Sequence, residues 1–114
     1  MTSKFIALSL SLLALAACEK SAPDYSSWHG KWTGVEGTYL SLTPQENGVY
    51  RIEIADLDGP RDFTGTAKEG GIEFTRNGET HVIHSGTGEE TGMKWLADKK
   101  DCLVVTANEG YCRD

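Results

Sequence analysis

The most reactive side chains of this sequence are its three cysteines, Cys18, Cys102 and Cys112. A cysteine thiolate can attack a substrate, bind a metal ion or be oxidised to a disulfide. A metal centre built on Cys102 and Cys112 would need further cysteines or a well-spaced histidine pair, and the sequence offers neither. We therefore expect these two residues to form a disulfide in an oxidising compartment, and we expect no metal ion or other cofactor.

Two other groups of side chains contain residue types that can bind metal ions. His81 and His84 are three residues apart, and such residues point to opposite faces of a strand, so the two rings cannot share a metal. The acidic segment at 56–58, followed by Gly59, resembles part of a calcium loop. If Gly59 took the sixth position of that loop, Ile54 and Gly65 would occupy the liganding first and twelfth positions. The segment is therefore interpreted as a hairpin turn.

The N-terminal stretch has the layout of an export signal. Lys4 supplies a positive charge, residues 5–15 are uncharged, and Leu15-Ala16-Ala17-Cys18 closes the stretch. This tetrapeptide resembles the lipobox of bacterial lipoproteins. The resemblance implies a signal peptide at 1–17, acylation of Cys18, and a short tether at 18–27 before a folded domain at 28–114. The apolar run is too short for a transmembrane helix.

The resemblance also implies a location. The partner of the acyl chains is a membrane, and Glu19 in place of aspartate favours the outer membrane, with the domain facing the periplasm. Loss of residues 1–17 would change the net charge from −6 to −7 because Lys4 is removed. An acidic surface repels phosphate backbones, so we expect no nucleic-acid partner.

The elements that must position these side chains are strands. Tyr50, Ile52 and Ile54 alternate with Arg51 and Glu53, and several other segments show the same period of two. We predict strands at 30–35, 38–43, 49–56, 61–68, 72–76, 79–84, 91–97 and 102–107. Residues 93–100 also fit a short helix, and that alternative remains open.

Tight turns should connect these strands. Asn47-Gly48 and Asn77-Gly78 suit hairpins because both residues tolerate positive φ. A further turn around Ala107 would place Cys102 nearly opposite Cys112. Eight short strands with tight connections predict an all-β fold, a small antiparallel up-and-down barrel.

Some short motifs resemble known families. Gly30-Lys31-Trp32 is similar to the Gly-x-Trp that opens the first strand of lipocalin-like and avidin-like barrels, which implies that Trp32 closes the barrel floor. The spacing of Trp28, Gly30, Trp32 and Gly34, together with the lipobox, resembles small uncharacterised bacterial lipoproteins, to which no activity is assigned.

A third resemblance is to membrane-bound inhibitors of c-type lysozyme, which are also small lipid-anchored barrels with one disulfide. Ser85-Gly86-Thr87-Gly88 resembles the loop that those inhibitors present to the enzyme, although the aromatic residue expected after it is replaced by Glu89. The resemblance implies a binding loop at Ser85, Gly86, Thr87 and Gly88.

We identify no sequence signature of catalysis: there is no Gly-x-Ser-x-Gly elbow, no His-Glu-x-x-His helix and no phosphate loop. We expect a lipid-anchored, non-enzymatic envelope protein that binds an unidentified ligand, either a protein, a small apolar molecule or an envelope polymer. An inhibitor of c-type lysozyme and a small hydrolase or isomerase with a dispersed site are the two alternatives.

Overall fold

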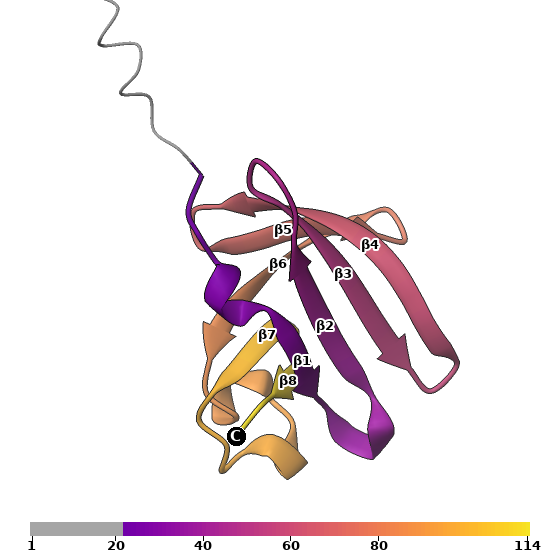
Figure 1. Ribbon diagram of the computed structural model, residues 1–114. Coiled ribbons are helices and arrows are strands. Elements are labelled where there is room, and N and C mark those ends of the chain that lie inside the picture. The colour runs from indigo at the N-terminus through magenta and orange to yellow at the C-terminus, as the bar shows by residue number, and fades with distance from the viewer. Residues whose placement is uncertain (1–21) are drawn as a thin grey trace, which may run out of the picture.

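The computed structural model describes residues 22–114 as a closed barrel of eight antiparallel strands, each hydrogen-bonded to the next along the chain (Figure 1). This confirms the predicted all-β, up-and-down barrel. The strands are β1 (Gly30–Thr33), β2 (Tyr39–Pro44), β3 (Val49–Asp56), β4 (Gly59–Lys68), β5 (Gly71–Arg76), β6 (Glu79–Gly86), β7 (Cys102–Thr106) and β8 (Glu109–Cys112). Four single turns of 3-10 helix accompany them: η1 (Ser26–Trp28), η2 (Val35–Gly37), η3 (Glu89–Thr91) and η4 (Lys94–Leu96).

The interior of the barrel is filled by its own side chains. The inward residues alternate with polar ones along each strand, so that Leu40 and Leu42 of β2 meet Ile52 and Ile54 of β3. Trp32 is only 1 % exposed and belongs to the same cluster. Burial of such side chains stabilises the fold by about 1.5–3 kcal/mol each. A barrel of this size holds its core where a larger one would hold a ligand.

The Asn-Gly turns adopt the predicted geometry. Asn77 and Gly78 have φ of 52° and 81°, and they join β5 to β6 where Arg76 pairs with Glu79. Asn47 and Gly48, with φ of 56° and 75°, lie in the turn between β2 and β3. Positive φ at both residues gives the turn a twist that matches the flanking strands.

The predicted strand at 91–97 is wrong. The chain forms η3 and η4 there, so the short-helix alternative is correct in the form of single 3-10 turns. The Thr91 hydroxyl donates to the Gly88 carbonyl at 2.6 Å, and Gly92 turns the chain with φ of 78°. A side chain at Gly88 would overlap the Leu96 carbonyl, because the segment folds back on itself there.

The segment from η3 to η4 covers a second, smaller apolar cluster outside the barrel wall. Leu96, Cys102 and Cys112 are its buried members, and Val35 and Met93 pack against them. Cys102 and Cys112 are paired across β7 and β8 and joined by a disulfide, as predicted. The eighth strand is Glu109–Cys112, which replaces the predicted strand at 91–97 in the count. It pairs with β7 through the hairpin turn predicted near Ala107.

One end of the barrel is covered by the residues that lead into β1. The Tyr25 N–H donates to the Tyr50 hydroxyl at 2.9 Å, and the Tyr25 hydroxyl donates to the Lys68 carbonyl at 2.6 Å. The Tyr25 and Trp28 rings stack with centroids 4.4 Å apart. Contacts with the barrel thus begin three residues before position 28, the predicted start of the domain. We call this the closed end.

The signal peptide at 1–17, Cys18 and the first part of the tether lie outside the described residues. Within 22–114, no helix has the length and apolar character needed to cross a membrane.

The barrel is closed by a weak seam. β1 pairs with β2 over four residues but pairs with β8 only at Thr33 and Cys112. Both strands have four residues, so few ladder hydrogen bonds join the first strand to the last. A groove on the outer surface follows this seam.

Candidate functional site

Two hollows in the structure are candidates for a site. The first is the barrel mouth, opposite the closed end, where the turns that follow β1, β3, β5 and β7 meet. It is a cavity of about 350 Å³ whose lining includes Arg61, Arg76, Glu109 and Tyr111. Ligand sites for small molecules occupy about 300–1,000 Å³, so the mouth is at the lower limit of that range.

A buried ion pair occupies the mouth. The Arg76 guanidinium donates two hydrogen bonds to the Glu109 carboxylate, at 3.0 and 2.7 Å, and the two side chains are 14 % and 22 % exposed. The Tyr111 hydroxyl donates to the same carboxylate at 2.7 Å. Arg76 also lies over the Phe74 ring at 5.6 Å. Bidentate pairs of this kind are among the stronger polar contacts in proteins.

The pKa values in the mouth follow from these contacts. Burial raises the pKa of Tyr111, and its hydrogen bond to Glu109 raises it further. Burial also opposes ionisation of Glu109, but the hydrogen bonds from Arg76 and Tyr111 outweigh it and hold the pKa of Glu109 below its usual value. The hydrogen bonds to Glu109 raise the pKa of Arg76. All three groups therefore keep their ordinary charges at neutral pH.

This arrangement stabilises the mouth but leaves few unpaired hydrogen-bonding groups there for a ligand. The carboxylate of Glu109 already accepts three hydrogen bonds, and the Arg76 fork is occupied by it. The Arg61 guanidinium forms an ion pair with the Asp56 carboxylate, with 3.7 Å between nitrogen and oxygen. His81, with its ring 5.5 Å from that of Phe74, is the remaining titratable group near the pair. A ligand that bound here through charge would have to displace an existing partner.

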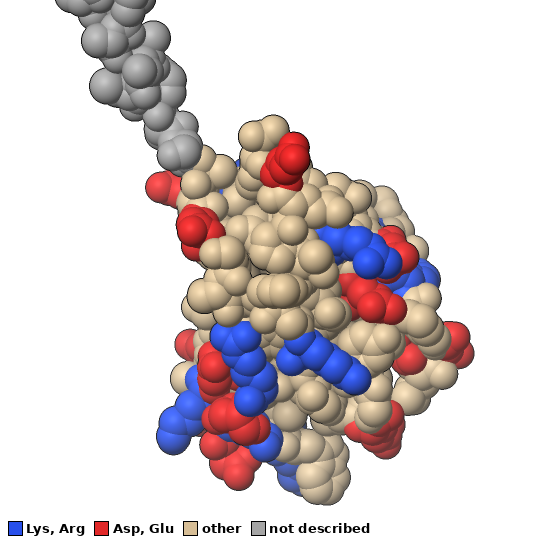
Figure 2. Space-filling model, viewed as in Figure 1, with Lys and Arg blue, Asp and Glu red and all other residues tan. Residues whose placement is uncertain are grey.

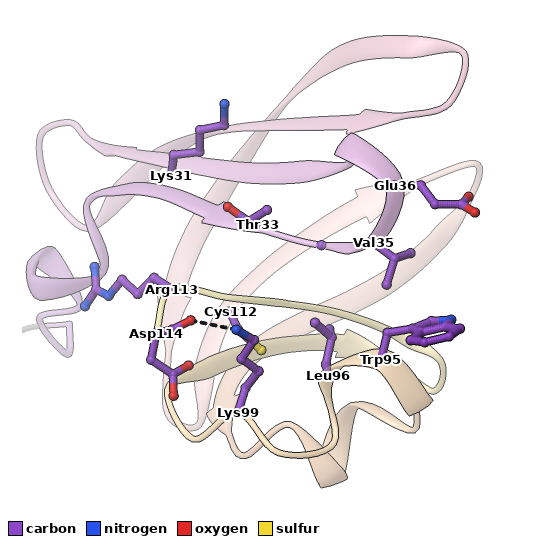
Figure 3. A pocket seen from close by; sticks show the side chains of 11 residues that line it. Lys31, Thr33, Val35, Glu36, Trp95, Leu96, Lys99, Cys112, Arg113 and Asp114 are labelled. Carbon is purple, nitrogen blue, oxygen red and sulfur yellow. Dashed lines mark hydrogen bonds between the residues drawn. The ribbon is translucent and has the colours of Figure 1, made fainter.

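The second hollow is the seam groove, which follows the outer surface along β1 and β8. It has a volume of about 700 Å³. Its walls come from β1 and η2 on one side and from η4 and the segment after β8 on the other (Figure 3). The residues used below are Lys31, Thr33, Trp95, Lys99, Arg113 and Asp114.

Trp95 lies at one end of the seam groove and Arg113 at the other (Figure 3). The Trp95 side chain is 77 % exposed, although tryptophan is one of the largest apolar residues. Its neighbour Leu96 is buried against the disulfide, so the η4 turn anchors one side chain and presents the other to solvent. An exposed aromatic side chain beside a groove is a feature of binding sites.

Positive side chains gather around the same groove. Lys31, Lys99 and Arg113 line it, and Lys94 and Lys100 lie in the adjoining segment, so that five of the nine Lys and Arg residues in 22–114 are in this region. Acidic residues are interleaved with basic ones on the lower part of the face in Figure 2. Glu36 and Asp114 also line the groove. Together with Asp98 and Asp101 of the adjoining segment, the region holds five basic and four acidic side chains, whereas the rest of residues 22–114 holds four basic and twelve acidic ones.

Several of these charges are fixed by the C-terminal segment. The Lys99 ammonium donates to the main-chain oxygen of Asp114 at 3.0 Å, and the Lys100 N–H donates to the Asp114 carboxylate at 2.7 Å. The latter bond lowers the pKa of Asp114. Lys31 lies 4.4 Å from the centroid of the Tyr39 ring. No carboxylate within 22–114 forms an ion pair with Lys31, Lys94 or Lys100, so these cations remain available.

Trp32, the predicted barrel-floor residue, lies inside the barrel near the closed end. Its indole N–H donates to the Trp28 carbonyl at 2.9 Å. The Arg113 guanidinium lies 3.9 Å from the centroid of its ring, donates to the Ser27 carbonyl and pairs with Asp101. Arg113 therefore both covers Trp32 and closes one end of the seam groove, a role that sequence reasoning missed.

The predicted binding loop at Ser85, Gly86, Thr87 and Gly88 is not a free loop. Ser85 and Gly86 belong to β6 and pair with Leu103 and Cys102. The Gly88 N–H donates to the main-chain carbonyl of Lys99, and the Thr87 N–H donates to the Glu90 carboxylate. Ser85 and Thr87 are exposed while Gly88 is buried.

The histidines and cysteines are placed as the sequence predicted. His81 faces the interior of the barrel beside Phe74, whereas His84 is exposed on the other face of β6. The sulfur atoms of Cys102 and Cys112 and a carboxylate oxygen of Asp114 lie within 4.8 Å of one another. The two sulfurs are bonded to each other, so they cannot act as thiolate ligands.

Sequence reasoning missed the Arg76–Glu109 pair, although a signal was present. Arg76 follows Ile72 and Phe74 at intervals of two in β5, so the alternation that buries those residues also points Arg76 inward. The same holds for Glu109 and Tyr111 in β8. No local pattern marks Trp95 as exposed, because its side chain lies on a 3-10 turn rather than on a strand.

Comparisons with known proteins give no family for this chain: no family model, no curated protein and no solved structure matches it.

Proposed function

We propose that this chain is a lipid-anchored, non-enzymatic protein of the bacterial cell envelope, and that it binds its partner through the seam groove. The observation that carries this proposal is the contrast between the filled barrel and the exposed indole. Side chains occupy the interior, while Trp95 is 77 % exposed beside a groove of about 700 Å³. Binding on the outer surface therefore fits this structure better than enclosure of a small apolar ligand.

The absence of catalysis in this proposal rests on how the titratable groups are used. The buried polar cluster, at the barrel mouth, is internally satisfied through Arg76, Glu109 and Tyr111. General acid–base catalysis needs a group whose proton is free to move to a substrate. The buried groups of the mouth have their hydrogen bonds directed at one another, and this arrangement favours a structural role.

The lipid anchor is proposed from the lipobox-like sequence that ends at Cys18. Tyr25, whose main chain and side chain both hydrogen-bond to the barrel, follows Cys18 by seven residue steps, which at about 3.5 Å per step span roughly 25 Å at most. This Tyr25 clasp lies at the closed end. Figure 1 shows the β2–β3 turn at one end of the molecule and the η3–η4 segment, in orange, at the other. In this proposal the end of the barrel that carries η4, and with it Trp95, lies away from the attachment of the anchor.

A photocrosslinking experiment in the native cells tests the binding surface. A benzophenone amino acid replaces Trp95 in the full chain, and the matched control carries it in place of Leu57, which is 73 % exposed on the β3–β4 turn. We expect a discrete higher-mass adduct from position 95 and none from position 57. Equal adducts from both positions, or none from position 95, would contradict the proposal.

A second experiment tests the anchor. Cys18→Ser should move the protein from the membrane fraction to the soluble periplasmic fraction, because acylation requires the thiol. A variant that stays in the membrane fraction as the wild type does would refute lipid attachment at Cys18 and leave the groove proposal intact.

A further inference from the structure

We propose that the seam groove binds an anionic glycan, a chain of pyranose sugars that carry carboxylates, and that the Trp95 indole is the platform on which one sugar ring stacks. This proposal rests on the proposed function, because it names the class of partner for the same groove. The argument uses the isolation of Trp95, the charges around it and the shape of the groove.

Trp95 is exposed, and only Val35 and Leu96 among the lining residues of the groove add further large apolar side chains beside it. Of the large hydrophobic residues in 22–114, only Leu57 and Trp95 are exposed, and Leu57 lies on the β3–β4 turn, which does not line the groove. The core of a protein–protein interface is depleted of charge, and its hot-spot tryptophans are surrounded by contacts that exclude water. Charged side chains flank Trp95 instead. The site is therefore unlike the centre of a protein interface.

A pyranose ring matches this environment better. One face of the ring presents C–H groups, which pack on the flat indole, while its hydroxyl groups point outward to polar side chains and water. Tryptophan is suited to such contacts because it combines a large apolar surface with limited rotamer freedom. In the groove, the Thr33 hydroxyl and the charged groups of Lys99 and Asp114 are within the same lining. They supply donors and acceptors for the edges of a sugar.

The charge around the groove selects an acidic ligand. Five basic side chains lie in or beside the groove against four acidic ones, Glu36, Asp98, Asp101 and Asp114, whereas the rest of residues 22–114 carries four basic and twelve acidic side chains. The rest of the surface repels an anionic polymer, so the groove is the place where such a polymer is attracted. Because these basic side chains are on the surface, their effect is screened by salt and contributes to orientation more than to affinity.

The shape of the groove suits a chain that passes along it. Figure 3 shows the groove extending between Arg113 and Trp95, with Val35 and Leu96 facing each other across it. Its volume of about 700 Å³ is in the range of small-ligand sites. A groove that runs along the barrel surface can hold an internal segment of a polymer, whereas the barrel mouth would admit only an end.

Pull-down and titration assays with the full-length protein in detergent test this inference. The probes are purified peptidoglycan sacculi, polygalacturonate, neutral chitohexaose and poly-glutamate. Polygalacturonate carries a free carboxylate on every ring, whereas the sugar chain of sacculi carries its free carboxylates on the attached peptides, so the two probes distinguish the two sources of that chemistry. We expect binding to at least one of them, weaker binding to chitohexaose, and a loss of affinity as salt rises.

Two variants make the assay specific for the groove. Trp95→Ala should weaken binding by roughly tenfold or more, as removal of a hot-spot tryptophan does. Leu57→Ala, the matched control, removes the other exposed hydrophobic side chain and should bind as the wild type does. Lys99→Gln should weaken binding several-fold and flatten the salt dependence.

The failures of this inference and of the proposed function are distinguishable. Equal or tighter binding of poly-glutamate would identify an acidic polypeptide as the partner, which overturns the glycan inference while the photocrosslink at position 95 still supports the groove. Absence of binding to both carboxylated glycans, or equal binding by Trp95→Ala and wild type, would also overturn the inference.

Discussion

The barrel mouth and the seam groove both contain basic, acidic and aromatic side chains, but these side chains are mostly buried in the mouth and exposed to solvent in the groove. In the mouth, Arg76 and Glu109 are 14 % and 22 % exposed, and each satisfies the other through two hydrogen bonds. In the groove, Trp95 is 77 % exposed, and Lys31 has an aromatic ring rather than a carboxylate as its neighbour. The polar groups of the mouth hydrogen-bond to one another and stabilise the fold, whereas those of the groove are exposed to solvent and can contact a partner.

The difference between the two regions follows from desolvation. A charge removed from water must be compensated by a partner, so a buried ion pair is strongly constrained and breaking it is expensive. A charge or an indole at the surface carries no such requirement, and its removal changes folding little. Substitutions in the mouth should therefore change stability, and substitutions in the groove should change binding. Five predictions test this division.

The largest effect is expected for Glu109→Ala. This variant leaves the Arg76 cation buried without its carboxylate, which destabilises proteins by about 3–5 kcal/mol. Chemical denaturation measures the free energy of unfolding. The matched control is Asp62→Ala, which breaks the exposed Arg51–Asp62 pair and should lower stability by less than about 1 kcal/mol. Similar losses in the two variants would contradict the division.

The pH dependence of Glu109 adds an independent check. The folded protein holds the pKa of Glu109 below 4.5, so the ionised carboxylate contributes stability above that pH and loses it as the pH falls through the folded-state pKa. The difference in unfolding free energy between wild type and Glu109→Gln should therefore shrink below about pH 4.5. A difference that stays constant down to pH 3 would show that the carboxylate charge is not responsible.

The next effect is expected for the disulfide, which lies under the groove. Replacing Cys102 and Cys112 together by alanine should lower the free energy of unfolding by roughly 3 kcal/mol in the chain-entropy model. Because Cys112 lines the seam groove, the variant should also bind its partner more weakly. Reduction of the wild type should reproduce both changes and leave the double variant unaffected. A reduced protein of undiminished stability would disprove this assignment.

Tyr111→Phe should have an intermediate effect of about 1.5 kcal/mol, the value of a hydrogen bond to a charged group. Burial raises the pKa of Tyr111 in the folded state, so the wild type should lose stability as the pH rises through the unfolded-state value near 10. Unfolding measured between pH 8 and 11 should show a flatter profile for Tyr111→Phe. Identical slopes in the two proteins would count against a buried hydroxyl.

The smallest effect on stability is expected for Trp95→Ala. The side chain is 77 % exposed, and substitutions at such positions change the free energy of unfolding by about 0.5 kcal/mol or less. The same variant should lose partner binding. A stability loss comparable to that of Glu109→Ala would show that Trp95 serves the fold, and the contrast between the two regions would disappear.

Much of the fold was predictable because most of the barrel follows local rules. The alternation in 49–56 and the turn at Asn77-Gly78 depend only on neighbouring residues, and both are confirmed. The pairing of Cys102 with Cys112 followed from composition and a short hairpin. The segment 91–97 was mispredicted because its conformation depends on tertiary contacts, such as the Asn108 N–H that donates to the Thr91 carbonyl.

The candidate sites were less predictable for the same reason. Arg76 and Glu109 are 33 residues apart and meet only when the barrel closes. Their inward positions can be inferred from the alternation in β5 and β8, but their pairing needs the register of the whole sheet. Arg113 and Trp32 likewise meet only across the seam. The exposure of Trp95 depends on Leu96 being the residue of η4 that the small outer cluster buries.

The Tyr25 clasp determines how the molecule responds to mechanical force. A pull on the N-terminal segment acts first on the two hydrogen bonds of Tyr25, to the Tyr50 hydroxyl and the Lys68 carbonyl. Their rupture would free Tyr25, while η1 stays held by the hydrogen bonds that Trp32 and Arg113 donate to the Trp28 and Ser27 carbonyls, and β1 remains paired with β2 over four residues. Tension on the N-terminal segment would thus be met first by the Tyr25 hydrogen bonds and next by those of η1, before the strand ladder of the barrel carries load.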